Sequence, residues 1–285
     1  MKKSIITILL ISFTLMSFAQ RKTAYVIYNK KGRKISYASM LRKIAKKNEV
    51  LLFGELHNNP ISHWLQLELT KDLSKKRQLI LGAEMFESDN QKELNDYLAG
   101  RIDAKELDTT ARLWKNFKTD YKPLVDFAKD NKLKFIAANI PRRYARTVYK
   151  EGLEVLEALP NNEKKWIAPL PIKYDADLPG YKAMMEMMGG HGGENFPKAQ
   201  AIKDATMAYF IWKNMLPGYL FIHYNGAYHS DGFEAIGWYL KKKNIDMPIV
   251  TISTVSQDNV YKLLEENKGK ADFIICVDED MTSTY

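Results

Sequence analysis

The stretch Leu51-Leu52-Phe53-Gly54-Glu55-Leu56-His57-Asn58-Asn59-Pro60 decides the predicted fold of this 285-residue chain. Its apolar start has the composition of a buried strand, and Gly54 marks the point where that strand opens into a loop. A carboxylate and an imidazole follow at once, at Glu55 and His57. Parallel sheets of α/β proteins hold their functional groups at this edge, the carboxyl ends of the strands. The stretch therefore predicts a buried strand with a polar site at its end.

The rest of the chain alternates short apolar runs with longer amphipathic segments, which is the pattern of strand and helix units around a parallel sheet. Strands are expected at residues 24–28, 50–53, 78–84, 134–139, 219–224, 248–252 and 273–277. Helices are expected at 39–47, 60–73, 90–98, 123–130, from 141 onward, and at 198–215, 232–242 and 260–266. The predicted fold class is α/β, a mainly parallel central sheet flanked by helices, in one domain over residues 20–285.

The first residues have the composition of a secretory signal peptide. A pair of lysines precedes the apolar run 5–16, and the small residues Ser17 and Ala19 fit cleavage after Ala19. We therefore expect residues 1–19 to be removed on export to the periplasm or envelope. The apolar run is shorter than the ~20 residues that span a bilayer, and no cysteine follows the signal to accept a lipid.

The charge and cysteine content narrow the classes of partner. The formal charge is +9, which suits acidic ligands or a phospholipid surface. The lysines are spread along predicted helices, and together with the expected export this argues against a nucleic-acid partner. The only cysteine, Cys276, lies in an apolar run, so neither an intramolecular disulfide nor a cysteine zinc cluster can form.

Residues 169–197 differ in character from the rest of the chain. They contain four prolines and five glycines, and methionines at 184, 185, 187 and 188 precede the segment Gly189-Gly190-His191-Gly192-Gly193. This composition fits neither a regular strand nor an ordinary linker. We expect a helical insertion with a mobile glycine-rich tip.

A Gly-x-x-His motif occurs twice, each time after a predicted strand. Gly54 to His57 is the first copy, Gly226 to His229 is the second, and Glu84 ends a strand between them in sequence. Because the carboxyl ends of parallel strands meet at one edge of the sheet, these polar groups are expected to converge. Arg142 and Arg143, which follow the strand 134–139, are expected to join them.

Five short motifs, each weak alone, occur in one order along the chain. They are Gly54–Pro60, Gly82-Ala83-Glu84-Met85-Phe86, Asn139-Ile140-Pro141-Arg142, the helix residues Gln200, Asp204, Met207 and Ala208, and Asn225-Gly226-Ala227-Tyr228-His229. With them the chain resembles the ChaN family of haem-binding, iron-regulated proteins, within the wider Tiki/TraB superfamily. The resemblance implies an α/β fold, export to the envelope, iron-linked expression and haem binding. That family includes lipoproteins, whereas the missing cysteine here favours a soluble periplasmic form.

A haem site needs an apolar cleft, an axial iron ligand and cations for the two propionates. In the 169–197 insertion, Tyr181 is the expected ligand of ferric haem iron, because a phenolate oxygen is a hard anionic ligand. His191 is the alternative ligand or a propionate donor. The other expected pocket residues are Tyr174, Met184, Met188 and Lys182. In the alternative interpretation the methionines are a core stripe, and His191 is only a polar residue in a glycine turn.

The strand ends support a second hypothesis. In the Tiki branch the paired motifs are linked to metal-dependent peptide cleavage, which implies a hydrolase that uses Glu55, His57, Glu84 and His229. Two imidazoles and one carboxylate would hold a divalent metal, and the remaining glutamate would accept a proton from bound water. Alternatively, Glu55 and His57 only hold the loops at this edge together.

The sequence thus predicts an exported haem-binding protein of a haem or iron uptake or storage system. A non-enzymatic haem binder is favoured over an enzyme; if the protein is an enzyme, a metal-dependent hydrolase is expected. The expected partners are haem, an outer-membrane haem receptor or other uptake component, and a second copy of the chain.

Overall fold

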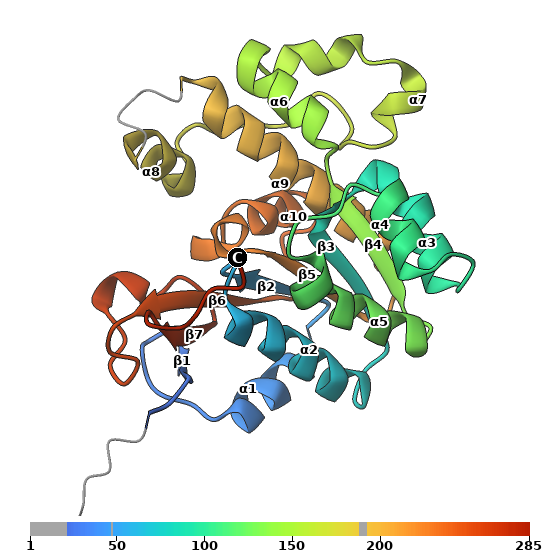
Figure 1. Cartoon of the computed structure of the whole chain (residues 1–285). Helices are drawn as coiled ribbons and strands as arrows, with labels where there is room; N and C mark the ends of the chain where they lie inside the picture. The colour runs from blue at the N-terminus through green and yellow to red at the C-terminus, as the bar shows by residue number, and fades with distance from the viewer. Residues whose placement is uncertain (1–21, 47, 188–192) are drawn as a thin grey trace, which may run out of the picture.

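The computed structural model describes residues 22–46, 48–187 and 193–285 (Figure 1). Within these residues, seven strands form one sheet in the order β1-β7-β6-β2-β5-β3-β4. All neighbouring strands are parallel except β1 and β7, which confirms the predicted α/β fold with a mainly parallel sheet. The strands are β1 (Tyr25–Asn29), β2 (Val50–Glu55), β3 (Leu79–Glu87), β4 (Lys134–Asn139), β5 (Leu220–Gly226), β6 (Ile249–Gln257) and β7 (Phe273–Asp278).

Helices cover both faces of the sheet. Side chains of α1 to α5 pack in the core on one face, and side chains of α9 and α10 pack on the other. Figure 1 shows α6, α7 and α8 grouped around α9, apart from the helices that cover the first face. The helices are α1 (Tyr37–Ile44), α2 (Pro60–Ser74), α3 (Gln91–Leu98), α4 (Ala104–Thr110), α5 (Lys122–Asp130), α6 (Arg142–Glu151), α7 (Asn161–Lys164), α8 (Pro179–Met187), α9 (Asn195–Asn214) and α10 (Ile236–Lys243).

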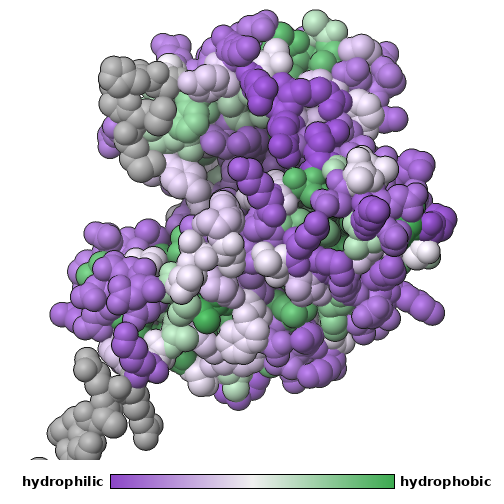
Figure 2. All heavy atoms as spheres, viewed as in Figure 1, coloured by the Kyte–Doolittle hydropathy of each residue, from purple (hydrophilic) through white to green (hydrophobic). Residues whose placement is uncertain are grey.

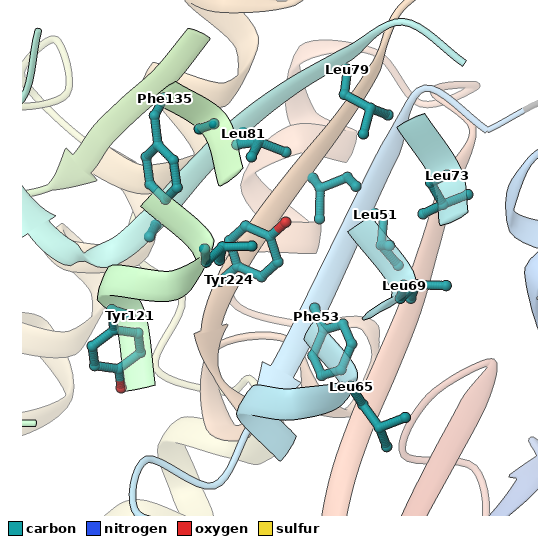
Figure 3. Close-up of a cluster of buried hydrophobic side chains, with 14 of the residues drawn as sticks. Leu51, Phe53, Leu65, Leu69, Leu73, Leu79, Leu81, Tyr121, Phe135 and Tyr224 are labelled. Carbon is teal, nitrogen blue, oxygen red and sulfur yellow. The ribbon is translucent and has the colours of Figure 1, made fainter. Parts of the chain in front are cut away.

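Strand β2 lies at the centre of the sheet and is buried along its whole length. A strand covered on both faces has a continuous apolar sequence and not an alternating one, which explains the run that begins at Val50. Leu51 and Phe53 lie in one core cluster with leucines of α2, as Figure 3 shows. Leu52 belongs to the cluster on the opposite face. Each such side chain contributes about 1.5–3 kcal/mol when it is fully buried.

The helix that follows the first motif begins where the sequence predicts it. Asn59 caps α2, because its side-chain oxygen accepts a hydrogen bond of 3.0 Å from the backbone N–H of Ser62. Pro60 occupies the first turn, where its missing N–H costs nothing. The cap holds the loop that carries His57 between β2 and α2.

The predicted helix at 260–266 is wrong. That segment contains only a short 3₁₀ turn at Glu265–Asn267. The Gln257 side chain donates to the carbonyl oxygens of Asn259 and Lys262 at 2.5 and 2.8 Å and accepts from the N–H of Leu264 at 3.2 Å. These bonds satisfy backbone groups that a helix would otherwise pair, so the loop is stable without one.

Two further segments differ from the prediction. Helix α10 begins at Ile236 and not at Gly232, because Gly232, Phe233 and Ala235 all have positive φ angles that interrupt a helix. Helix α4 and the π-helical turn Phe117–Tyr121 are absent from the prediction.

The predicted insertion contains α8, and the chain enters α9 at Asn195. The predicted glycine-rich tip falls largely on residues 188–192, which lie outside the described residues. In the part of the chain that the structure describes, no helix is both long enough and apolar enough to cross a membrane. The signal peptide and the extent of the domain stay predictions.

Candidate functional site

The two Gly-x-x-His motifs lie side by side, because β2 and β5 are parallel neighbours. Their register places Gly54 opposite Asn225 and Glu55 opposite Gly226. Strand β3 pairs with the other edge of β5 and brings Glu84 to the same end of the sheet. The predicted convergence of these groups is therefore observed.

The glycine of each Gly-x-x-His motif leaves space that a residue of the other motif occupies. A Cβ atom on Gly54 would lie 2.8 Å from the Cα of Ala227 and 2.9 Å from the carbonyl oxygen of Ile252. A Cβ atom on Gly226 would lie 2.7 Å from Nε2 of His57. All three distances are well below ordinary contact, so a side chain at either position would force the motifs apart.

Glu55 and His57 form a hydrogen-bonded pair. Oε1 of Glu55 lies 2.9 Å from Nδ1 of His57. Tyr121 donates its hydroxyl to Oε1 at 2.6 Å, and Gln66 donates its amide to Oε2 at 2.5 Å. Glu55 is buried, and these three partners fix its carboxylate.

His57 is the exposed member of this pair. Its side chain is 35% exposed, whereas that of Glu55 is fully buried. Asn116 donates to the His57 carbonyl oxygen at 2.9 Å, and the Trp114 ring lies edge-on with its centroid 4.9 Å from the imidazole. Burial alone would lower the pKa of His57, but the hydrogen bond that His57 donates to Glu55 and the charge of Glu84 outweigh burial and raise the pKa.

His229 lies between two buried carboxylates. Its Nδ1 is 2.5 Å from Oδ1 of Asp204, and its Nε2 is 3.3 Å from Oε1 of Glu84. The other oxygen of Glu84 accepts the N–H of Gly226 at 2.8 Å. Burial opposes the charge of His229, but Glu84 and Asp204 outweigh burial and raise its pKa to about 10. Burial likewise opposes the charge of Glu84, but the neighbouring His229 lowers the pKa of Glu84.

This pairing bears on the predicted metal site. An imidazolium that donates from both nitrogens has no lone pair for a metal, so ligation would require His229 to lose its proton and leave a carboxylate. Among the described residues, no group of three or more His, Cys, Asp and Glu side chains is arranged to hold a metal ion. The metal-dependent hydrolase stays a prediction.

The insertion is joined to the strand ends through Asp204. The Tyr181 hydroxyl donates to Oδ2 of Asp204 at 3.0 Å, and the ring is buried beside Met184. Burial and the charge of Asp204 raise the pKa of Tyr181 above its ordinary range. The Tyr174 ring lies 5.7 Å from that of Tyr181, between centroids.

The other predicted haem residues are placed less centrally. Lys182 is exposed and pairs with Asp177 at 2.8 Å, so it does not reach the strand ends through this contact. Met188 and His191 lie outside the described residues.

A cavity of about 1210 Å³ opens at the strand ends. Figure 2 shows the surface hollowed between the part that carries α6 and the part that carries the sheet. Glu55, His57, Glu84 and His229 all line this cavity, whereas Tyr181 does not. Its apolar lining includes Leu113, Trp114, Ile140, Met184, Phe196 and Val255, and its cationic lining consists of Lys115, Arg142, Lys203 and Lys270.

Of the two predicted arginines, only Arg142 lines the cavity. Its guanidinium also forms an ion pair with the buried Glu87. Arg143 instead pairs with Asp89 at 2.6 Å, so the prediction that both arginines join the site is wrong.

Sequence reasoning missed the residues that hold Glu55 and His57. Gln66 shares the buried face of α2 with Ser62, Leu69 and Leu73. A large polar residue on a helix face that otherwise carries leucines is the sequence signal from which this partner of Glu55 could have been predicted. Tyr121 and Asn116 belong to the π-helical turn and its cap, for which the sequence carries no periodic signal.

A mainly parallel sheet with a ligand-sized cavity at its carboxyl edge is the arrangement in which α/β proteins commonly bind small molecules. The sequence model of the family described as "Haem-binding uptake, Tiki superfamily, ChaN" matches residues 40–240. The chain belongs to this family, which confirms the resemblance seen in its motifs.

Solved structures share the fold. The structure titled "Cofacial heme binding to ChaN of Campylobacter jejuni" is 19% identical and superposes with a TM-score of 0.65 over 88% of this chain and 96% of that chain. A structure described as a succinoglycan biosynthesis protein is 11% identical, with a TM-score of 0.52 over 90% of this chain and 94% of the other. At these identities the likeness shows the fold alone.

A curated relative matches a shorter region. Protein RETICULATA-RELATED 5, chloroplastic, of Arabidopsis thaliana is 34% identical over 111 residues, which is 37% of this chain. The match spans 15% of that relative's length.

Replacing Gly54 by alanine should destabilise the fold, because the new Cβ would meet the backbone of Ala227. We expect a loss of about 1–3 kcal/mol in the free energy of unfolding, measured by urea denaturation. Gly237→Ala is the matched control: the nearest atom to its Cβ is Cδ1 of Leu52 at 4.0 Å, and α10 gains helix propensity. Equal stability of the two variants would contradict the steric explanation.

The contribution of His229 to stability should depend on pH. Its pKa is about 10 in the folded chain against an ordinary value of 6.5, so the folded state binds more protons between these values. The stabilisation is complete below the lower value and is lost as pH rises through the higher one. Urea denaturation of the wild type and of His229→Gln from about pH 6 to 10 should show their difference shrinking. A difference that is constant with pH would refute the ion-pair assignment.

Proposed function

We propose that this protein is exported and binds haem in the strand-end cavity, as part of a haem or iron uptake or storage system. One observation carries the proposal: a cavity of about 1210 Å³ with apolar walls and a cationic lining, in a chain of the haem-binding uptake family. Sites for drug-sized ligands measure roughly 300–1,000 Å³, so the cavity is large enough for a porphyrin.

The residues present fit such a ligand. Trp114, Met184 and Phe196 offer apolar surface for the porphyrin faces. Lys203 lines the cavity and is half-buried, and it forms no salt bridge with the described residues, so its ammonium group is available for a propionate. Arg142 is a second cation on the lining, although Glu87 already neutralises part of its charge.

Tyr181 is the proposed ligand of ferric iron, with His191 as the alternative. A phenol binds Fe(III) as a phenolate, and therefore has to lose its proton. Oδ2 of Asp204 accepts the hydrogen bond of this phenol at 3.0 Å and is positioned to receive that proton. Tyr181 does not line the cavity, whereas Met184 of the same helix does. Ligation therefore also requires the Tyr181 ring to move toward the cavity.

Two further partners complete this proposal. A second copy of the chain would cover the open face of the cavity, and an outer-membrane haem receptor or other uptake component would exchange haem with it. For export, the expected mature protein begins at Gln20, and mass spectrometry of the protein recovered from the envelope fraction checks this.

Titration of the purified protein with haemin, followed in the visible spectrum, tests haem binding. The wild type should give a shifted Soret band, and Tyr181→Phe should change the spectrum by removing the phenolate ligand. Lys203→Ala should keep the spectrum and weaken binding about tenfold, the expected loss for one charged hydrogen bond.

The exposed Tyr149 of α6 supplies the matched control, and Tyr149→Phe should bind haemin as the wild type does. An unshifted Soret band in the wild type would refute haem binding. A shifted band that is unchanged in Tyr181→Phe and in His191→Ala would refute only the proposed ligands.

A further inference from the structure

Two tight turns at the edge of the sheet opposite the cavity each expose an aliphatic side chain. Helix α9 enters β5 through the turn 216–219, which a backbone hydrogen bond of 3.1 Å between its end residues closes. Helix α10 enters β6 through the turn 244–247, closed in the same way at 3.2 Å. Leu216 is 40% exposed and Ile245 is 72% exposed, and neither belongs to a core cluster of the described residues. Turns ordinarily expose polar residues, glycine or proline, so packing of the fold does not explain these two side chains.

The two turns are neighbours at the amino edge of the sheet, where the parallel strands begin. Val50 of β2 is the register partner of both Phe221 in β5 and Ile249 in β6. Neighbouring strands are about 4.8 Å apart, so the two turns lead into strands that are about 10 Å apart, on either side of β2. The guanidinium of Arg77 donates to a carbonyl oxygen of the first turn and to one in the loop before β2, at 3.3 Å each. The turns are therefore held as parts of one surface.

Cations surround both turns. The segments 213–219 and 241–248 carry four lysines, and Asp246 is their only carboxylate. None of these four lysines forms a salt bridge with the residues that the structure describes. Residues 75–77 at the end of α2 add three more cations, one of them paired with a carboxylate of that helix, and Glu49 is a further exposed carboxylate at this edge. The amino edge is thus positively charged overall.

Aromatic side chains complete this surface. Trp212 is 42% exposed and shares one face of α9 with Tyr209, whose ring centroid lies 5.4 Å from Nζ of Lys213. On α10, Nζ of Lys242 lies 4.9 Å from the ring centroid of Trp238. Lysines at a helix C-terminus interact favourably with the helix dipole, which explains their position locally. The aliphatic and aromatic groups exposed among them require another explanation.

We propose that the amino edge of the sheet docks on a membrane surface that contains anionic phospholipids. The lysines would contact the headgroup phosphates, and Leu216, Ile245 and the Trp212 ring would insert at the boundary between headgroups and acyl chains. A Cβ atom on Gly218 would meet no atom within 4 Å, so the first turn projects into solvent. A fluid bilayer accepts projecting side chains without a shaped pocket. A lipid surface therefore suits two projecting turns better than a folded protein partner does.

Docking through the amino edge leaves the cavity open. Glu55, Gly226 and Ser256 line the cavity near the carboxyl ends of β2, β5 and β6, whereas the two turns precede β5 and β6. The six residues of β2 separate the two edges by about 20 Å. The docked protein would hold its cavity toward the aqueous phase. Vesicle binding and haem binding should therefore be independent of each other.

Co-sedimentation with lipid vesicles tests the proposal on the haem-free chain from Gln20 onward. The protein should pellet with vesicles of equal parts phosphatidylglycerol and phosphatidylcholine and stay in solution with phosphatidylcholine alone. Raising the salt concentration from about 0.05 to about 0.5 M should release it, because salt screens the lysines. Combined replacement of Lys213, Lys242 and Lys243 by glutamine should weaken binding roughly 100-fold. Ile245→Ser should weaken it at least about tenfold, because the inserted aliphatic group is lost.

Two control variants change matched residues on other surfaces. Combined replacement of the exposed Lys22, Lys105 and Lys150 by glutamine removes the same charge, and Leu264→Ser removes a leucine that is 48% exposed after β6. Both should bind vesicles as the wild type does. Circular dichroism checks the fold of every variant, and haemin titration is measured separately, so failure of haem binding and failure of docking are distinguishable.

Three outcomes would overturn the proposal. The first is a wild type that does not pellet with the anionic vesicles, or that pellets equally with phosphatidylcholine alone. The second is vesicle binding by the lysine variant and by Ile245→Ser that equals that of the wild type. The third is a change of oligomeric state in Ile245→Ser, measured by sedimentation equilibrium, with vesicle binding unchanged. That result would assign the edge to contact between two copies of the chain.

Discussion

The register between β2 and β5 is the constraint on which the site depends. It sets Glu55 opposite Gly226, so each motif lies in the space that the other motif's glycine leaves open. A slip of one residue would turn every side chain of the strand to the opposite face of the sheet. Strand β2 is apolar and buried on both faces, so packing alone would tolerate that slip better than it would in a strand with one apolar and one polar face. The close fit at Gly54 and Gly226 therefore specifies the register where hydrophobicity cannot.

A second chain of contacts joins the insertion to the sheet. It runs from Tyr181 on α8 through Asp204 on α9 to His229 and then to Glu84 on β3. Removing one member would leave a buried charge without its partner, which typically costs about 3–5 kcal/mol. The position of α8 is thus tied to the protonation of His229. The haem site predicted in the insertion and the polar site predicted at the strand ends are connected parts of one region.

Local patterns predicted the parts of the structure that local physics determines. The apolar runs gave the strands, and parallel topology alone implied that Glu55, Glu84 and both motif histidines would meet. What the sequence did not reveal depends on distant pairs. Tyr121 reaches Glu55 from a π-helical turn that has no periodic signature. Asp204 is one of the motif residues, but no local pattern marks its pairing with His229, which lies 25 residues further along the chain. The loop after β6 was predicted wrongly for the same reason. Its backbone carbonyl groups are hydrogen-bonded by the Gln257 side chain, which no periodic sequence pattern indicates.

The proposed haem site occupies the space in which the two motifs meet. His57, Met184 and Phe196 belong to one cavity lining. A flat ligand large enough to use that apolar lining excludes water from the cavity. The polar groups at the strand ends, Glu55, His57, Glu84 and His229, would therefore face the ligand and not solvent.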